Sequence, residues 1–503
     1  MRYDTGVGPR GAWRSLVARL LWEQEVPSSN LGAPTTSPPE RPLATRSLSR
    51  NERDAGVSRL RRLPQGSEGR ASTTRDRAAG AAIAGMLGLA IAGVLWPTVP
   101  VMAATVPAWA ALALLWPGIE RWQRLQSLAF IAVGLIALTW AADQGTAPSL
   151  ESLLGQNQPI LSMLASVTLL RLLNRPPRAD EPELPRGRRA YVQSMLGVHA
   201  LGAVINISAV ILIADRLART RRLGVDQAQL ISRAFSAVAF YSPFIGGVAL
   251  ALASTPGSNP LVMAAFGMPL AGVAFLLLYA YARGARSQEV ERFRGYPVHV
   301  ASLRVPLALG SAVLAAAATT SRYSVLDLIT MITPLLVAIV LLRRDGLRAL
   351  RAGGVDYVVS RAPQMGTELA LFLSAGVMAA GLIAAAGAAG GWTLFARLDA
   401  FHASLLLLAF FLTSLVGIHP VVIVGVAAPL AATIDADPTL LATTFAMGWG
   451  LGCAVNPMSG INMVLSSRYG ISNWRVARGN VGFSAALYCV AVGLLFLFQL
   501  TRL

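Results

Sequence analysis

The stretch AVNPMSGINM, from Ala454 to Met463, lies inside an apolar run that extends from about Thr439 to Leu465. That run is too long for one simple membrane crossing, which needs about 20 apolar residues. Asn-Pro, Ser and a second Asn stand at its middle, where polar groups are costly in lipid. A second stretch, FYSPFIGGVA from Phe240 to Ala249, repeats the pattern of a polar residue followed by proline and glycine. Both stretches predict membrane helices that are interrupted in their middle.

The composition predicts an all-α membrane protein that crosses the bilayer many times. The chain has 503 residues, of which 54% are hydrophobic and only 14% charged, whereas soluble domains carry about 25% charged residues. The net charge is +18, but every basic residue is arginine, and the arginines cluster in the N-terminal tail and in short loops. That distribution is typical of cytoplasmic loops, so we expect no nucleic-acid partner. The two cysteines, Cys453 and Cys489, lie in apolar segments and show no metal-ligand spacing.

The N-terminal tail, residues 1–77, is rich in Arg, Pro and Ser and has no apolar periodicity, which predicts disorder. Two interpretations of it stay open. One is a genuine cytoplasmic arm. The other is translation from a codon upstream of the true start, because the stretch WEQEVPSSNLGAPT can be encoded by a sequence that resembles the end of a transfer-RNA gene.

Arginine clusters between the apolar runs predict about eleven transmembrane helices and two re-entrant hairpins. Arginines flank residues 190–215 on both sides, and acidic residues flank residues 401–434, so each segment is expected to enter and leave the membrane on one side. The predicted order is an extra first helix (78–98), a first inverted repeat (99–283, with hairpin 190–215), a cytoplasmic loop (284–302) and a second inverted repeat (303–503, with hairpin 401–434). The N-terminus is then cytoplasmic.

Short motifs recur in the two halves in the same order. Gly197-Val198-His199 in the first predicted hairpin corresponds to Gly417-Ile418-His419 in the second. Ser242-Pro243-Phe244-Ile245-Gly246 in the first long helix corresponds to Asn456-Pro457-Met458-Ser459-Gly460 in the second. Five full crossings in each half is an odd number, so the second half is inverted relative to the first. An inverted repeat with interrupted helices indicates a secondary transporter.

The predicted site lies where the helices break. Proline removes a backbone donor and clashes with the preceding turn, which frees carbonyls and half-helix ends to hold an ion or an anionic group. The candidate binding residues are His199, Asn206, Ser208, Ser242, Pro243, Gly246, His419, Pro420, Asn456, Pro457, Ser459 and Asn462. Some of these residues have a structural alternative. The prolines would be plain kinks, the histidines would cap hairpin turns, and Asn206 and Ser208 would pack a hairpin arm.

Three other charged residues are interpreted as anchors rather than as parts of the site. Arg233 is expected to extend its charged end to the membrane interface. Asp327 and Glu368 lie near predicted helix ends, where a carboxylate anchors the helix.

This layout resembles the ion transporter superfamily, and in particular the divalent-anion/sodium symporters. The resemblance covers residues from about 78 to 503 and rests on the order of helices, hairpins and breaks. It implies elevator-type movement and, by analogy, a homodimer. Symporters of that family carry Ser-Asn-Thr at each hairpin tip, whereas the tip regions here read GVHALGAVINISA and LVGIHPVVIVG. The large membrane subunit of tripartite carriers is a related alternative that would need a separate binding protein.

We therefore expect a secondary active transporter in the bacterial inner membrane. Its substrate would be a small, organic anion, driven by Na⁺ or H⁺, with no cofactor and no resident metal. The sequence has neither a phosphate-binding glycine loop with lysine nor a His-Glu-x-x-His helix, so we do not expect an enzyme. The alternatives that stay open are an ion channel, an intramembrane lipid-handling enzyme and the tripartite-carrier subunit.

Overall fold

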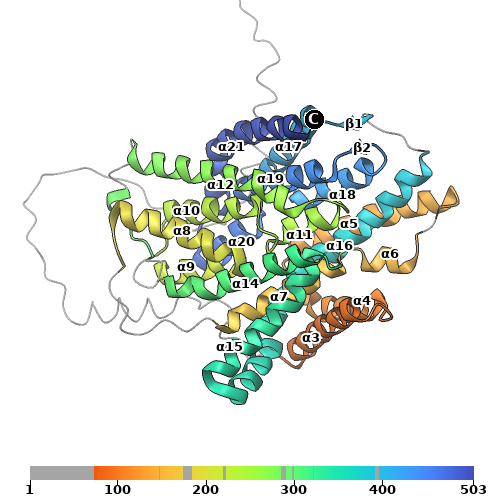
Figure 1. Cartoon of the computed structure of the whole chain (residues 1–503), viewed down its shortest axis with the longest axis horizontal. Helices are drawn as coiled ribbons and strands as arrows, with labels where there is room; N and C mark the ends of the chain where they lie inside the picture. The colour runs from red at the N-terminus through yellow and green to blue at the C-terminus, as the bar shows by residue number, and fades with distance from the viewer. Residues whose placement is uncertain are drawn as a thin grey trace, which may run out of the picture. The chain divides into compact units, whose positions relative to one another are not determined.

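The computed structural model describes residues 73–146, 148–173, 184–218, 222–284, 290–296, 300–320, 322–390 and 396–502 (Figure 1). The first helix, α3, begins at Thr74, so the predicted tail boundary at residue 77 lies within it. Thr73 and Asp76 form a capping box at this end, each side chain accepting a backbone N–H from the other residue, which satisfies donors that a helix start leaves free. The rest of the predicted tail, residues 1–72, lies outside the described residues.

The first half of the chain folds into helices that pack around one interrupted element. The elements in order are α3 (Thr74–Leu95), α4 (Val101–Leu115), η2 (Trp116–Gly118), α5 (Arg121–Asp143), α6 (Leu150–Gly155), α7 (Gln158–Thr168), η3 (Leu169–Leu173), α8 (Gly187–Ile205), α9 (Ser208–Ala218), α10 (Val225–Ser236), η4 (Ala237–Phe240), α11 (Gly246–Ala253) and α12 (Pro260–Arg283). The gap between η4 and α11 contains the Ser-Pro motif.

The second half also contains a helical hairpin that is followed by an interrupted helix and a last long helix. It contains α14 (Val300–Thr319), α15 (Val325–Asp356), η5 (Tyr357–Arg361), η6 (Ala362–Met365), α16 (Gly366–Ala388), β1 (Arg397–Leu398), α17 (Ala400–Leu415), α18 (Pro420–Ala431), β2 (Asp435–Ala436), α19 (Pro438–Val455), α20 (Gly460–Tyr469) and α21 (Asn473–Arg502). The Asn-Pro motif occupies the gap between α19 and α20.

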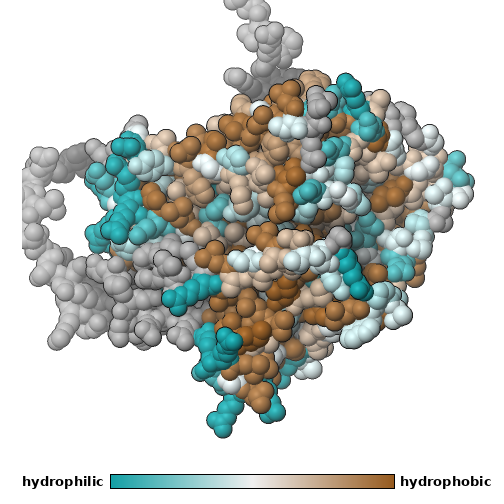
Figure 2. Space-filling view, viewed as in Figure 1, coloured by the Kyte–Doolittle hydropathy of each residue, from teal (hydrophilic) through white to brown (hydrophobic). Residues whose placement is uncertain are grey.

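The architecture is that of an all-α polytopic membrane protein. Seven helical segments of the described chain are long and apolar enough to cross a membrane, and one of them, Val325–Ala388, contains both α15 and α16. Large apolar side chains face outward on these helices; Ile136 is 69% exposed and Leu276 is 67% exposed. Figure 2 shows hydrophobic residues over the middle of one face and hydrophilic residues at its margins. Lipid rather than water suits such a surface.

Each of the about eleven predicted crossings corresponds to a helical element of the described chain, although only seven segments there are continuous, long and apolar enough to count as spans by themselves. The remaining crossings are α14, α16, which is counted in one segment with α15, and two short or interrupted elements: α7 has 11 residues, and α10 and α11 have 12 and 8. Taken singly, α7, α10 and α11 are each shorter than a helix that spans a bilayer. The predicted order of helical elements therefore agrees with the fold, and the predicted interruptions explain why α10 and α11 are short.

Both predicted hairpin segments fold back on themselves. In the second, β1 and β2 pair in parallel, Arg397 opposite Asp435, so the chain before α17 lies beside the chain after α18. In the first, both ends contact the segment at residues 293–296. Gly187 donates its N–H to the Phe293 carbonyl, and the Arg216 guanidinium hydrogen-bonds the Tyr296 hydroxyl. The turns are short, Asn206–Ile207 in the first hairpin and Val416–His419 in the second.

The two interrupted helices pack against each other in opposite directions. A Cβ atom at Gly247 would lie 2.0 Å from the Trp449 ring, and one at Gly450 would lie 2.4 Å from the Phe240 ring, so both contacts need glycine. Farther along, Ser232 donates to the Asn462 side chain. Along these contacts the residue numbers decrease in the first interrupted helix while they increase in the second, so the two helices are antiparallel. Close approach through small residues is the usual basis of helix packing in membranes.

A glycine next to the first break provides a test of this packing. A Cβ at Gly267 of α12 would lie 2.0 Å from the backbone oxygen of Phe240, and backbone cannot rotate out of the way. We expect Gly267→Ala to lower stability by about 1–3 kcal/mol through overpacking. The matched control is Gly272→Ala in the same helix, where no atom lies within 4 Å of the new methyl group. Thermal unfolding in detergent should show a loss for Gly267→Ala only; equal midpoints would contradict this contact.

Candidate functional site

The second break, between α19 and α20, is built around Asn456. This side chain is fully buried, and its amide donates to the Ile418 carbonyl in the turn of the second hairpin at 2.8 Å. Its Oδ1 accepts the N–H of Met458 at 2.7 Å. Pro457 follows it and has no N–H to continue the helix. One asparagine thus holds the broken backbone and ties it to the hairpin turn.

Asn462 and Ser459 complete this break. Ser459 caps α20, since its hydroxyl accepts the N–H of Asn462. The Asn462 amide donates to the Asn456 carbonyl at 2.9 Å, and its Oδ1 accepts from Ser232 of α10 at 3.0 Å. Carbonyls that the missing helical turn would leave unsatisfied therefore receive side-chain donors. The network also crosses from the second half of the chain into the first.

Arg233 extends this network as a buried cation. Its Nε donates to Oδ1 of Asn480 in α21 at 2.8 Å, and Nη2 donates to the Gly479 carbonyl at 2.6 Å. The rings of Tyr281 and Phe483 lie 5.6 and 5.5 Å from its guanidinium carbon. Arg233 is only 7% exposed, so the predicted position at the membrane interface is wrong. The charge is held inside the helical packing by polar and aromatic partners.

The first break, between η4 and α11, mirrors the second in one respect. The Ser242 hydroxyl donates to the Ala203 carbonyl near the end of α8 at 2.6 Å, just as Asn456 donates to Ile418. Pro243 lies in the gap, and α11 begins at Gly246, which packs against the ring of Phe372 in α16. Each break is therefore hydrogen-bonded to the hairpin of its own half.

His199 does not lie at a hairpin tip, as its sequence match to His419 suggested. It lies inside α8, and the turn comes seven residues later, at Asn206. Its Nδ1 is 3.1 Å from the Ala234 carbonyl and its Nε2 is 2.9 Å from the Tyr241 hydroxyl. A carbonyl only accepts, so Nδ1 carries the hydrogen, and in the neutral ring Nε2 accepts from Tyr241. The histidine joins α8 to the first interrupted helix.

His419 and Pro420 do lie at the second hairpin turn. His419 is the N-cap of α18, where its Nδ1 accepts the N–H of Val421 at 3.2 Å. Its ring meets Trp449 edge-on, with centroids 5.2 Å apart. Pro420 occupies the first position of α18, where proline is well tolerated. The capping alternative therefore describes the contacts of His419, and each of the two histidines contacts the interrupted helix of its own half.

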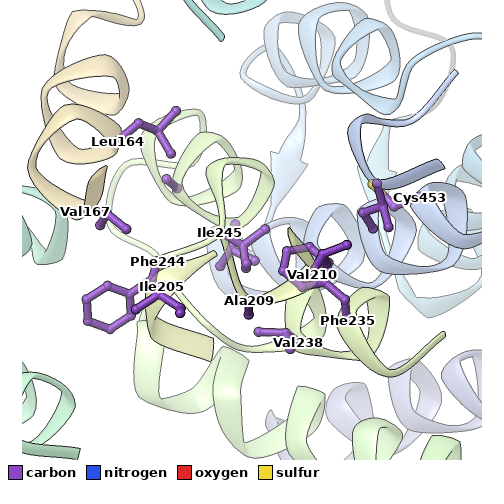
Figure 3. Packing of buried hydrophobic residues seen from close by; sticks show 14 of the residues in the cluster. Leu164, Val167, Ile205, Ala209, Val210, Phe235, Val238, Phe244, Ile245 and Cys453 are labelled. Carbon is purple, nitrogen blue, oxygen red and sulfur yellow. The ribbon is translucent and has the colours of Figure 1, made fainter. Parts of the chain in front are cut away.

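Asn206 and Ser208 line a separate cavity of about 40 Å³ beside the first hairpin turn. Its remaining lining comes from α7, η3, η6 and α16, and includes Thr168, Arg171 and Glu368. Figure 3 shows the apolar packing around this turn, with Leu164 and Val167 of α7, Ile205 and Ala209 of the hairpin, and Phe244 and Ile245 of the first break. The turn also reaches the second break, because a Cβ at Gly460 would lie 3.5 Å from Ile207.

Asn206 is the one non-glycine residue with a positive φ in the described part of the chain (φ 54°, ψ −144°). Such a conformation costs a side-chain-bearing residue about 1–3 kcal/mol. We expect Asn206→Ala to unfold at a lower temperature than Asn206→Gly, because glycine adopts this backbone freely. Both variants lose the bond from the Ile207 N–H to Oδ1, so that loss cancels in the comparison. Equal midpoints would contradict strain at this turn.

The predicted site residues therefore fall into three groups. His419, Pro420, Asn456, Pro457, Ser459 and Asn462 surround the second break, while His199, Ser242, Pro243 and Gly246 surround the first. Asn206 and Ser208 line the cavity. Sequence reasoning missed Ser232 and Asn480, which complete the buried network. The signal for Asn480 was a polar residue near the start of a long apolar helix, a pattern too common to single it out.

No protein-family model matches this sequence, and no curated protein resembles it in sequence. Among solved structures, the chain is similar to the Alcanivorax borkumensis YdaH transporter, whose crystal structure reveals an unusual topology. The two are 15% identical with a TM-score of 0.39, and the match covers 74% of this chain and 97% of that one. A likeness at this level carries no conclusion about activity, so the proposals below rest on the contacts of this chain.

Proposed function

We propose that this protein is a secondary active transporter of a small organic anion, coupled to Na⁺ or H⁺, in the bacterial inner membrane with its N-terminus in the cytoplasm. The observation that carries the proposal is the matched pair of breaks. Two antiparallel helices are each interrupted at a buried polar-Pro motif, and each break is hydrogen-bonded to its own hairpin. Interrupted helices in inverted repeats are how transporters place a binding site inside the membrane.

An anionic substrate suits the charges near the breaks. After each break a new helix begins, α11 at Gly246 and α20 at Gly460, and helix starts carry partial positive charge and free N–H groups. Arg233 adds a full positive charge to the polar network of the second break. Because the surroundings are apolar, these charges act on an anion more strongly than they would in water.

Elevator-type movement is part of the proposal. The hairpins and interrupted helices would move as one unit, since Arg468 of α20 forms a two-point ion pair with Asp215 of α9 at 2.9 and 3.0 Å. That pair joins the first hairpin to the second interrupted helix. The hairpins would re-enter the membrane from opposite sides, and α3, α4, α14 and α15 would belong to a static scaffold, with a homodimer as the expected assembly.

Uptake of radiolabelled carboxylates into proteoliposomes tests the function. A panel of mono-, di- and tricarboxylates is presented under an inward Na⁺ gradient, an inward H⁺ gradient, or neither. Saturable accumulation that requires one gradient supports the proposal. Current without saturation would indicate a channel, and chemical conversion of lipid an enzyme. No uptake of any compound under either gradient, by protein that is folded by thermal unfolding, would contradict an organic-anion carrier that works without a partner.

A further inference from the structure

Glu368 lines the cavity beside the first hairpin turn, and one of its carboxylate oxygens has no hydrogen-bond partner in the described chain. Glu368 lies in the first turn of α16, and its Oε2 atom is inaccessible and has no hydrogen-bond partner among the described residues. A buried polar atom without a partner is costly, and an ionised one more so. A proton or a bound cation would neutralise the carboxylate at this position.

The size of the cavity limits what else could enter it. One water needs about 10–15 Å³ of such space, so about 40 Å³ accommodates a small ion with a few waters but not an organic anion. Its lining supplies further oxygen atoms from Thr168, Ser208 and Gln364. Carboxylate, hydroxyl and amide oxygens are the ligands that hard cations prefer.

Few charged groups surround Glu368. Among the described lining residues the other charged one is Arg171 of η3, which is close enough to act electrostatically on the carboxylate. Of the elements packed against α16, α5 carries Arg121, Arg124 and Asp143 and α6 carries Glu151, and none of these lines the cavity; α4, α7, α18, η2 and η6 contain no charged or titratable residue. Arg171 is therefore the charged side chain of the described lining that acts on the Glu368 carboxylate.

We propose that Glu368 is the centre of a monovalent-cation site, for H⁺ or Na⁺, in the cavity beside the Asn206 turn. The proposal rests on the transport function proposed above and assigns the coupling cation to a place in the fold. The cavity joins α7 and η3 of the first half to η6 and α16 of the second, with the strained hairpin turn as one wall. A cation there would affect the conformation of the turn directly, because Asn206 and Ser208 line the same space. The earlier interpretation of Glu368 as a helix anchor gives no role to its inaccessible oxygen.

Thermal unfolding of the purified full-length chain in nanodiscs tests this without any substrate. A cation that binds the folded chain raises the midpoint. If the cation is Na⁺, NaCl raises the wild-type midpoint relative to choline chloride at constant pH. If the cation is H⁺, lowering the pH in choline chloride raises the wild-type unfolding midpoint. In either case Glu368→Gln should remove at least half of that shift, while Glu151→Gln, an exposed glutamate in the first turn of α6, should keep it. An equal shift in wild type and Glu368→Gln, or no shift in wild type, overturns the proposal.

A second measurement covers the case in which Glu368→Gln does not fold. A hydrophobic carbodiimide modifies protonated carboxyl groups, and mass spectrometry locates the modification in the wild-type chain. We expect modification of Glu368 that NaCl slows at least threefold if Na⁺ binds, or that rising pH slows if only H⁺ binds. Modification independent of both overturns the proposal. Uptake of carboxylates is a separate readout, so a failed cation site and a failed transport function remain distinguishable.

Discussion

Asn456→Ala is expected to reduce the initial rate of carboxylate uptake at least 100-fold. The substitution removes the bond to the Ile418 carbonyl of the second hairpin and the bond from the Met458 N–H across the break. Each hydrogen bond contributes about 1 kcal/mol, and a buried group left unsatisfied costs about 1–3 kcal/mol. The break would lose the two contacts that fix its geometry, and a site misplaced by about 1 Å loses activity by orders of magnitude.

Two further variants separate geometry from general destabilisation. Asn456→Asp keeps the acceptor for Met458 but cannot donate to Ile418, so we expect it to fold better than the alanine variant and still transport poorly. Ser236→Ala is the matched control, because it removes a buried hydroxyl that has no partner among the described residues. Rates are compared at equal amounts of reconstituted protein. Wild-type uptake by Asn456→Ala would remove Asn456 from the site.

Asn480→Leu is expected to lower the stability of the chain by about 3 kcal/mol. Asn480 is fully buried, and its Oδ1 accepts from the Arg233 guanidinium while its amide donates to the Ala454 carbonyl. Leucine fills the space but leaves a buried charge without one of its acceptors, which is among the costlier single changes in a protein interior. The position joins α21 to both α10 and α19, so the loss affects all three helices.

A double-mutant cycle identifies Arg233 as the cause of that loss. The double variant, Arg233→Met with Asn480→Leu, removes both the charge and its acceptor. We therefore expect its loss of unfolding free energy to be smaller, by about 1–3 kcal/mol, than the sum of the losses in the two single variants. Arg475→Met, an exposed arginine at the start of α21, serves as the control and should change little. Chemical or thermal unfolding in detergent measures the four proteins of the cycle and the control. Strict additivity would mean that the two side chains do not depend on each other.

The breaks themselves could be predicted from the sequence, because their cause is local. Pro243 and Pro457 cannot donate a backbone hydrogen bond, and a polar residue precedes each of them. Both helices are interrupted there. The all-α membrane class follows in the same way from composition and from the length of the apolar runs. The order of the helical elements follows from the same apolar runs and from the arginine clusters between them.

The position of the first hairpin turn was decided by tertiary structure. The sequence match between Gly197-Val198-His199 and Gly417-Ile418-His419 placed it near His199, but helix α8 continues to Ile205. Turns in apolar segments are weakly encoded, because small apolar residues suit both a helix and the close packing around a turn. Asn206 adopts a strained backbone there, and that strain persists only because α7 and the second interrupted helix pack around the turn.

The partners of the polar residues were also decided only by the tertiary structure. The sequence determined that Asn456, Ser459 and Asn462 would be costly in lipid, and hence that something polar must satisfy them. Ser232, distant in the chain, donates to Asn462, and Asn462 donates to the Asn456 carbonyl at the break. Asn480 donates to the Ala454 carbonyl just before the break. The same holds for Arg233 and Glu368. A charged residue near a helix end has the same local sequence pattern whether its side chain is exposed to water or buried. Burial depends on which helices pack over it, and long-range packing leaves no local signature.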